Sequence, residues 1–263
     1  MAKFYPLFSS SKANASYIGT KNSGILIDAG ASCKKIFDTL SCNDLKPTCI
    51  QGIFITHTHS DHIKGLKTLV SKLHVPVYAS KITLEFLMHQ GYLSEHTEMI
   101  SVSTDSKIMH CGDCEIKTFP TMHDAKGSCG YQIHTSDDKY CAVCTDLGIV
   151  TPEVKQALHG CDMVLLEANY DPDMLWQGTY SFDLKQRITS QYGHLSNQDS
   201  AEFANYLIHS GTTRLLLGHL SQNNNTPELA VSAVTRALHE FIPDIDYLLG
   251  VAPVETMGGA VIF

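Results

Sequence analysis

Four potential metal ligands lie within six residues of this chain, in the run T-H-T-H-S-D-H at residues 56–62. The run follows a short apolar segment that has the character of a buried strand. In a loop between a strand and a helix, His57 and His59 can converge on one ion, while Asp61 and His62 turn towards a second. Imidazole and carboxylate are ligands for zinc and similar ions. The run therefore predicts a metal site at the end of a strand.

The same run has a plainer interpretation, as a polar surface loop in which Asp61 caps the following helix. A cap accounts for one of the four side chains and leaves the three histidines unexplained. A chance match to this spacing is expected in about a few sequences per thousand. Metal binding is therefore the interpretation that we carry forward.

The rest of the chain alternates between strand and helix patterns. Strands are expected at Lys3–Phe8, Ala15–Thr20 and Ile25–Asp28 as an antiparallel meander, then at Gln51–Thr56, Val75–Ala79, within about 97–146, and at Val164–Glu167 and Leu215–Gly218. Turns are expected at Ser9–Asn14, Lys21–Gly24, Cys111–Cys114 and Ser136–Lys139. Helices are expected at Cys33–Leu40, Ile63–Leu73 with Ser60 as N-cap, Lys81–Gln90, Pro152–Leu158, Asp183–Gln191, Asn197–His209 and Pro227–Phe241. This order predicts an α/β fold with two β-rich halves, each covered by helices on its outer side.

Composition limits the class of protein. The 263 residues contain no linker, repeat or charge block, so we expect a single domain over 1–263. The longest apolar runs are too short to span a bilayer and no secretory signal is evident, which favours the cytoplasm. Nine cysteines, an odd number, favour reduced thiols over a disulfide framework. Cys111-x-x-Cys114 and Cys141-x-x-Cys144 have zinc-ribbon spacing, but Cys141 and Cys144 lie in one expected strand and face opposite sides.

The run at 57–62 resembles the signature of the metallo-β-lactamase-fold hydrolases, whose fold is a four-layer αβ/βα sandwich. The resemblance implies three later ligands at strand ends, and His123, Asp146 and His219 stand in those contexts. By this similarity, His57, His59 and His123 would hold one metal, Asp61, His62 and His219 a second, and Asp146 would bridge the two. The shell of histidine and carboxylate suits zinc, manganese or iron.

The resemblance narrows to the bacterial YycJ-like (VicX or WalJ) subgroup, which is regarded as metal-dependent nucleases acting on DNA from a 5′ end. It rests on residues 7–18, 27–30, 57–66, 145–148, 167–170, 193–197 and 218–224. The sequence departs from the subgroup at Ser10 and Ala13, where glycine is usual, and at Tyr170, where histidine is frequent. These departures leave the predicted ligands untouched but put the shape of the Asn14 loop in doubt.

Several polar residues are candidates for substrate contact. His194 would act as a general acid that protonates the departing oxygen, and Ser196 would offer the start of a helix to a phosphate. A simple helix cap with an exposed histidine is the alternative. Asn14, Asn169 and Ser221, together with Glu167, could position phosphate or orient ligand imidazoles, and ordinary loop hydrogen bonding explains them equally well.

A net charge of −8 argues against a sequence-specific DNA binder, because phosphate contacts come from lysine and arginine. Two divalent ions would add about +4 at the site itself. A local basic rim is also expected from Lys12, Lys34, Lys35, Lys64, Lys185 and Arg187.

The sequence thus predicts a phosphodiesterase with two divalent metals, in which a shared hydroxide attacks phosphorus and Asp61 or Asp146 orients it. We expect a 5′ to 3′ exodeoxyribonuclease whose partner is an end of DNA. Two alternatives stay open: a metal-dependent hydrolase of a thioester, lactone or lactam, and a regulatory metal-binding protein without catalysis. The oligomeric state does not follow from the sequence.

Overall fold

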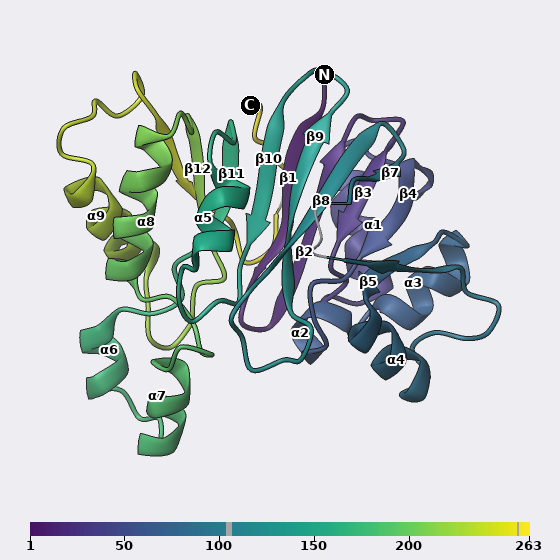
Figure 1. Ribbon diagram of the computed structural model, residues 1–263, viewed down its shortest axis with the longest axis horizontal. Coiled ribbons are helices and arrows are strands. Elements are labelled where there is room, and N and C mark those ends of the chain that lie inside the picture. Colours follow the sequence, from purple (N-terminus) through teal and green to yellow (C-terminus); the bar gives the residue numbers. More distant parts are fainter. Residues whose placement is uncertain (104–106, 257) are drawn as a thin grey trace.

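The computed structural model describes residues 1–103, 107–256 and 258–263, and in these it places two β-sheets face to face (Figure 1). The first sheet runs in the order β1 (Lys3–Ser10), β2 (Ala13–Gly19), β3 (Gly24–Ile27), β4 (Ile50–Phe54), β5 (Val77–Ser80) and β6 (Met99–Val102). The second runs in the order β13 (Leu248–Val251), β12 (Arg214–Gly218), β11 (Met163–Glu167), β10 (Tyr140–Cys144), β9 (Cys129–Thr135), β8 (Cys114–Pro120) and β7 (Met109–Cys111).

Helices cover the outer side of both sheets. The first sheet carries α1 (Cys33–Cys42), α2 (Ser60–Ile63), α3 (Leu66–Leu73) and α4 (Lys81–His89), with a 3₁₀ turn at Pro47–Cys49. The second carries α5 (Pro152–Leu158), α8 (Asn197–His209) and α9 (Pro227–Ala237). Helices α6 (Pro172–Gln177) and α7 (Phe182–Ile188) project from the body, towards the bottom of the view (Figure 1). The predicted four-layer αβ/βα sandwich is confirmed.

Three apolar layers hold the sandwich together. Side chains such as Ile36 and Leu66 pack under the helices of the first sheet, and Leu207 and Val234 do the same on the second. A third layer, which includes Phe54, fills the space between the sheets. Each buried large apolar side chain contributes about 1.5–3 kcal/mol relative to exposure. The layers therefore fix the two sheets rigidly with respect to each other.

The direction of the strands decides at which edge of the sheets the candidate ligands lie. Strands β3 and β4 are parallel, as are β10, β11 and β12. Parallel neighbours have their carboxyl ends at the same edge of a sheet, where α/β proteins bind ligands. Residues that follow these strands are thus brought together although they are far apart in the sequence.

The predicted strands are present, but some of them begin or end at other residues than expected. The meander of β1, β2 and β3 is antiparallel as expected, but the expected turn at Ser9–Asn14 is wrong in extent. Ser9 pairs with Asn14 and Ser10 with Ala13, so the turn is confined to two residues. The short turn brings Asn14 into the sheet edge. Strand β13 was not predicted, because its residues are half-exposed and show no clear alternation.

The helix expected at Ile63–Leu73 is two helices, α2 and α3, and Ser60 is not its N-cap. His59 takes that position without a side-chain bond. The interruption lies at Gly65, whose N–H donates to the carbonyl of Ala29 at 2.7 Å. A Cβ atom at Gly65 would lie 2.1 Å from the carbonyl oxygen of Ala31, so only glycine allows this close approach.

The later helices also differ at their ends. Helix α7 ends at Ile188 rather than Gln191, α9 ends at Ala237 rather than Phe241, and α6 was not predicted. Helix α6 has six residues, too few for a periodic pattern to be recognised. Within the described part of the chain, no helix combines the length and apolar character that crossing a bilayer requires.

Candidate metal centre

The predicted ligands meet at one edge of the sandwich. They follow β4, β8, β10 and β12, and the set comprises His57, His59, Asp61, His62, His123, Asp146 and His219. Two of them, Asp61 and His62, lie on α2, and the others lie in loops directly after strands. The structure thus brings together all seven residues that the sequence suggested.

The ligand atoms form overlapping groups. Those of His57, His59 and His123 all lie within 4.8 Å of one another, and so do those of Asp61, His62 and His219. Asp146 forms a third such group with His57 and His62. The third group shares His57 with the first and His62 with the second, so the three groups adjoin one another.

Each of the five histidines has one ring nitrogen held by a partner outside this set. The partners are Thr56 Oγ1 for His57 at 3.0 Å, Asp124 Oδ1 for His59 at 3.4 Å, Asp28 Oδ2 for His62 at 2.8 Å, the carbonyl of Gly193 for His123 at 3.0 Å, and Glu167 Oε1 for His219 at 2.8 Å. Such contacts fix ring orientation and tautomer in metal sites. The other nitrogen of each ring faces the group.

Three of the facing atoms have no hydrogen-bond partner although they are buried: His57 Nε2, Asp146 Oδ2 and His219 Nε2. A buried polar atom without a partner costs about 1–3 kcal/mol. Each of the three atoms belongs to a residue of one of these groups, and a bound divalent cation would supply the missing partner. The residues present therefore fit a metal.

The surroundings shift the pKa values of the rings in opposite directions. Burial lowers the pKa of His57 well below its ordinary value, so this imidazole is neutral, the form that binds metal. Burial also acts to lower the pKa of His219, but Asp146, Asp61 and Glu167 outweigh it and raise the pKa to about 10. The neighbouring carboxylates thus favour the charged form of this imidazole.

Two of the ligands stand on an unusual backbone. Asp146 has φ 59° and His219 has φ 56°, and Asp28 beside them has φ 61°. A residue other than glycine costs about 1–3 kcal/mol in the left-handed region. The surrounding contacts hold this strain at the place where each strand ends and its ligand turns towards the centre.

Glu167 connects the metal group to His194. The carboxylate is completely buried, and its Oε1 lies 2.8 Å from Nδ1 of both His194 and His219. Its Oε2 accepts from the N–H groups of Leu147 and Leu195, each at 3.1 Å. Burial acts to raise the pKa of Glu167, and the two histidines lower it to about 2. Glu167 is thus an ionised anchor for both rings.

A further group of possible ligands consists of Asp146, Glu167, His194 and His219. Glu167 already engages Nδ1 of both histidines, and His219 Nε2 points away to Asp61 Oδ2 at 3.5 Å. The Nδ1 atoms of both histidines in this group therefore already have a partner. His194, with 19% of its side chain exposed, stands beside the other groups.

Three of the suggested substrate contacts hold loops that carry ligands. Asn14 Nδ2 donates to Asp61 Oδ2 at 3.2 Å and lies 3.1 Å from His62 Nε2. Asn169 Nδ2 donates to the carbonyl of His219 at 2.8 Å, and the N–H of Ser221 donates to the carbonyl of Asn169. All three are buried. Their contact with substrate stays a prediction.

Ser196 takes the plainer of its two expected roles, as the N-cap of α8. It forms a capping box with Asp199, and the N–H of Asn197 donates to the carbonyl of Tyr170. A phosphate at this helix end would have to displace those bonds. The sequence did not distinguish the two roles because both require a hydroxyl before a helix.

Asp28 is a functional residue that the sequence analysis missed. It accepts from the backbone N–H of Thr56 at 2.9 Å and bonds Nδ1 of His62 at 2.8 Å. Its position after β3 is the signal that could have found it, because β3 and β4 are parallel and end side by side.

The expected basic rim is mostly neutralised. Lys34 pairs with Asp38, Lys35 with Glu255 and Arg187 with Asp124, while Lys185 is buried against backbone carbonyls. Lys12 and Lys64 are exposed. Positive charge at this edge would therefore come chiefly from bound metal.

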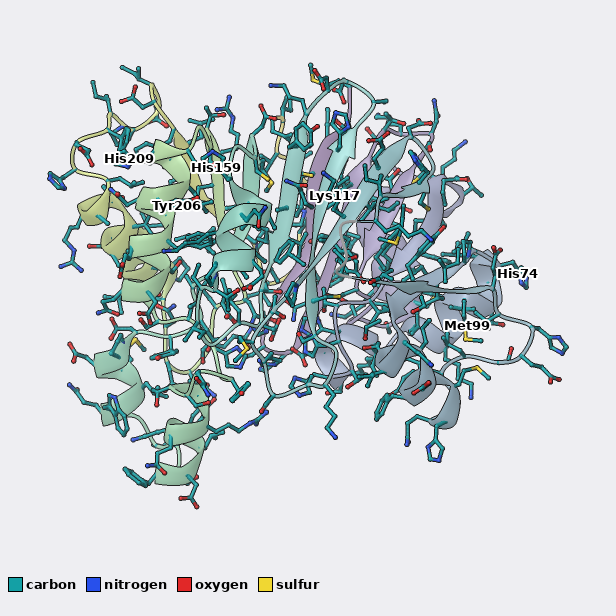
Figure 2. The ribbon with its side chains drawn as sticks, in the orientation of Figure 1. His74, Met99, Lys117, His159, Tyr206 and His209 are labelled. Atoms are coloured by element: carbon teal, nitrogen blue, oxygen red, sulfur yellow. The ribbon has the colours of Figure 1, made fainter. Side chains whose placement is uncertain are left out.

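Several other histidines lie apart from the centre, and in the described part of the chain no cysteine belongs to a possible ligand group. Figure 2 shows His74 at the right of the molecule and His159 and His209 in its upper left part. All nine cysteines are free thiols, and Cys42 alone among them is exposed. Cys141 faces the layer between the sheets and Cys144 faces the helices, which confirms that they cannot chelate one ion together.

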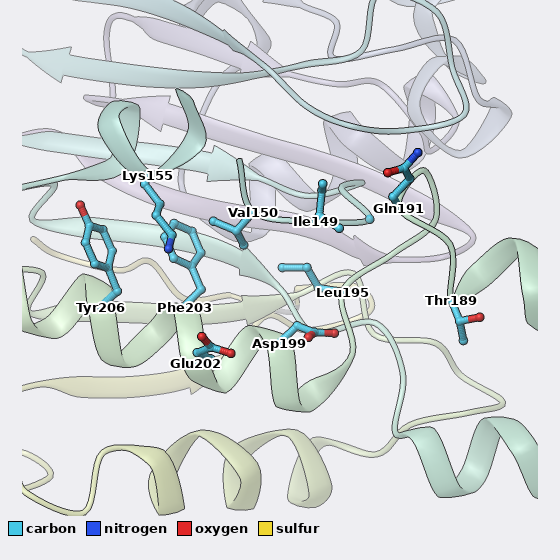
Figure 3. Close-up of a pocket in the computed structure, with 11 residues that line it drawn as sticks. Ile149, Val150, Lys155, Thr189, Gln191, Leu195, Asp199, Glu202, Phe203 and Tyr206 are labelled. Atoms are coloured by element: carbon cyan, nitrogen blue, oxygen red, sulfur yellow. The ribbon is translucent and has the colours of Figure 1, made fainter. Parts of the chain in front are cut away.

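A separate cavity of about 410 Å³ lies between α5 and α8 (Figure 3). Its lining includes Lys155, Phe203 and Tyr206, and none of the seven predicted ligands is among its lining residues. Leu195 lines it from the loop that carries His194, so this cavity lies behind the metal centre rather than in it.

Comparison with known proteins gives concordant results. A family model described as the Beta-lactamase superfamily domain matches residues 24–220. The chain is 37% identical over 229 residues to Exodeoxyribonuclease WalJ of Streptococcus pneumoniae serotype 2 (strain D39), which covers 87% of this chain and 85% of that protein. It is 36% identical over 238 residues to Exodeoxyribonuclease YycJ of Bacillus anthracis, covering 90% and 89% of the two chains.

Among solved structures, the chain is similar to the metallo-beta-lactamase fold protein YhfI from Bacillus subtilis, with a TM-score of 0.74 and 17% identity. This likeness covers 97% of this chain and 98% of that one. At this level of identity it concerns the fold alone. The likeness in sequence and the likeness in fold extend over nearly the whole length.

Proposed function

The chain belongs to the beta-lactamase superfamily and to the family of the exodeoxyribonucleases WalJ and YycJ, and we propose that it hydrolyses DNA from an end in a metal-dependent reaction. The observation that carries the proposal is that three atoms of the ligand groups, His57 Nε2, Asp146 Oδ2 and His219 Nε2, are buried and without hydrogen-bond partners. Such atoms fit a cation better than any neutral ligand.

We propose two divalent ions. The group of His57, His59 and His123 would hold one, the group of Asp61, His62 and His219 the other, and Asp146 would contact both. The donor set of imidazole and carboxylate suits zinc, manganese or iron. When bound, divalent ions make water a stronger nucleophile at neutral pH and neutralise charge that develops on phosphoryl oxygens.

The side chains of this chain supply orientation and proton transfer. Asp61 is the least buried carboxylate of the group, at 20% side-chain exposure, and Asn14 fixes its Oδ2, so it can orient the attacking water. His194 has Nδ1 held by Glu167, which leaves Nε2 to give a proton to the departing oxygen. A partly exposed histidine beside a buried centre has the access that this role needs.

We further propose cleavage in the 5′ to 3′ direction and, because all nine thiols are free, a cytoplasmic location. Degradation of single-stranded DNA labelled at either end tests the direction. Early release of a 5′ label supports it, and early release of a 3′ label overturns it.

The test of the reaction combines metal analysis of the native protein with a cleavage assay under added manganese, magnesium or zinc. Substrates are 5′-phosphorylated single-stranded DNA and a panel of thioesters, lactones and lactams. An Asp146→Ala variant should lose metal-dependent cleavage by about 10³-fold or more, since one buried ligand shared by two ions is removed. Asp38→Ala, at an exposed carboxylate, should retain full activity.

Two results would overturn the proposal. Turnover of the small substrates alone would assign the centre to a different hydrolase. Bound metal without turnover of any DNA end would assign it to a regulatory protein.

A further inference from the structure

We propose that Arg187, at the end of α7, is a positioning residue that keeps the carboxylate of Asp124 out of the set of metal ligands. Arg187 engages one oxygen of Asp124, and the other oxygen lies beside the rings of His59 and His123. This inference rests on the proposed function and adds to it how one coordination position stays open for the reaction.

Asp124 lies within reach of the candidate centre. Its Oδ1 is 3.4 Å from Nε2 of His59 and 3.4 Å from Nε2 of His123. In the described part of the chain, Asp124 nevertheless belongs to none of the possible ligand groups. Carboxylate oxygens are good ligands for divalent ions. A rotation of this side chain would therefore add a ligand to the group of His57, His59 and His123.

Arg187 opposes that rotation. Its Nε donates to Oδ2 of Asp124, and among the described residues it is the only lysine or arginine that pairs with this carboxylate. Hydrogen bonds between two charged groups are stronger than those between neutral groups. Because Arg187 holds Oδ2 from outside the centre, Oδ1 is directed at the ring of His59. The carboxylate thus orients a ligand instead of becoming one.

The end of α7 is fixed on the loop that carries His123. The N–H of His194 donates to the carbonyl of Ile188 at 3.0 Å, and the N–H of Gly193 donates to the carbonyl of Ser190 at 2.8 Å. A Cβ atom at Gly193 would lie 2.1 Å from the carbonyl oxygen of Ile188, so this turn closes tightly. The carbonyl of Gly193 then holds Nδ1 of His123 at 3.0 Å. The end of α7 and the turn after it therefore contact two consecutive residues of one loop.

Stability does not account for the pair of Arg187 and Asp124. Their side chains are 56% and 28% exposed, respectively, and partly exposed ion pairs contribute little to the free energy of unfolding. The pair has a larger consequence for the metal centre. Catalytic metal sites keep one coordination position open, whereas structural sites fill it with a further protein ligand. Arg187 therefore preserves an open position by engaging Asp124.

The test compares Arg187→Ala, Asp124→Ala and the variant that combines them, each titrated with cobalt at about 1 M ionic strength. The Debye length is then about 3 Å, so the direct effect of the Arg187 charge on the ion is screened. Arg187→Ala should bind cobalt roughly 10-fold more tightly, because the freed carboxylate adds a ligand, and Asp124→Ala roughly 10-fold more weakly, because His59 loses its partner. The combined variant should match Asp124→Ala within about twofold, since Arg187 acts through Asp124.

The visible absorption spectrum of the cobalt-loaded chain gives a second readout. The bands weaken as the coordination number rises, so Arg187→Ala should show weaker bands than the wild type, and the combined variant should not. Arg187→Lys keeps a cation at this position and should stay close to the wild type. Arg236→Ala is the matched control, because it removes an exposed arginine from the last turn of α9. It should leave cobalt affinity and spectrum unchanged.

Cleavage of DNA separates this role from a contact with substrate. In Arg187→Ala, kcat should fall about 10-fold while KM stays within about twofold, because Arg187 does not act on the substrate directly. A raised KM with unchanged cobalt affinity would overturn the proposal and assign Arg187 to a phosphate. Weaker cobalt binding in Arg187→Ala, or tighter binding that persists in the combined variant, would also overturn it.

Failure of the proposed function gives a different result. Cobalt binding with the expected affinities but without cleavage of any DNA would overturn the proposed function and leave the role of Arg187 in the metal centre. A wild-type chain that binds no cobalt would overturn both.

Discussion

The two halves of the molecule supply the metal centre in different ways. The half built on the first sheet, called the N-terminal half, provides His57, His59, Asp61 and His62 from one loop and one short helix after β4. The half built on the second sheet, called the C-terminal half, provides single residues after β8, β10 and β12. The first set is a local arrangement that a few consecutive dihedral angles define. The second exists only when three strands are aligned. One metal centre can therefore take some ligands from a single loop, whose dihedral angles position them, and others from separate strands, whose alignment positions them.

Each half also has its own buried carboxylate behind the ligands. In the N-terminal half, Asp28 bonds Nδ1 of His62. Thr56 Oγ1 lies 3.3 Å from the same Nδ1 atom and can act as a second acceptor. Glu167 holds both His219 and His194 through one oxygen. The C-terminal half thus depends on a single group where the N-terminal half has two.

The largest difference is expected between Glu167→Gln and Asp28→Asn. The amide of glutamine would present N–H groups either to the two Nδ1 atoms or to the N–H groups of Leu147 and Leu195, and both arrangements oppose donors. We expect a loss of about 100-fold in kcat/KM or metal affinity for Glu167→Gln and about 10-fold for Asp28→Asn. Cleavage kinetics and metal competition titrations measure both. Equal losses would contradict the distinction between the halves.

Metal removal should lower stability and loosen the two halves unequally. A metal at 100 times its dissociation constant contributes about 2.7 kcal/mol, which corresponds to roughly 5–10 °C in Tm. The N–H groups of Leu147 and His219 donate to side chains, whereas that of His62 donates to a backbone carbonyl. Hydrogen exchange after chelation should therefore rise most at Leu147 and His219. A uniform rise would show that both halves relax alike.

Replacing a residue outside the metal centre that has a left-handed backbone conformation should stabilise the protein. His74 ends α3 with φ 53°, a conformation that glycine adopts without strain. His74→Gly should stabilise the fold by about 0.5–1 kcal/mol, since the relief of strain exceeds the added chain entropy. Urea denaturation gives the free energy of unfolding, and cleavage activity should stay at the wild-type level. A loss of activity would place His74 in the functional region.

The smallest effect concerns His134, a histidine on β9 remote from the metal centre. Its hydrogen bond to Asp138 at 2.9 Å, with a further one to Glu115, raises the pKa above 6.5, and the ring stacks on Tyr140. The stabilisation is fully present below pH 6.5 and is lost as the pH rises through the raised pKa. Asp138→Asn should bring the pKa back towards 6.5 in an NMR titration, with cleavage unchanged. An unshifted pKa in the variant would contradict the assignment.

The same contrast explains what could be predicted from the sequence. The run at 57–62 needs no tertiary information, because its spacing alone indicates a metal site. His123, Asp146 and His219 required the resemblance to a family, since a single histidine or aspartate after a strand has no distinctive pattern. Their convergence depends on β10, β11 and β12 being parallel neighbours.

Asp28 and α6 show why the remainder was missed. The bond from Asp28 to His62 joins residues 34 positions apart, and only the pairing of β3 with β4 brings them together. Helix α6 is stabilised by Asp171 at its start and by Lys185 from the next helix, neither of which appears as periodicity. Contacts between elements, rather than patterns within them, decide both cases.

The exposure of Cys42 has a practical consequence. It is the single thiol of nine that a reagent can reach without unfolding the chain, and it ends α1 on the first sheet. Trp176, the single tryptophan, lies on α6 beyond the second sheet. A fluorophore attached at Cys42 and the native indole thus form one donor and acceptor pair. Energy transfer between this pair can report the distance between the two halves as the protein folds, and it requires no change of sequence.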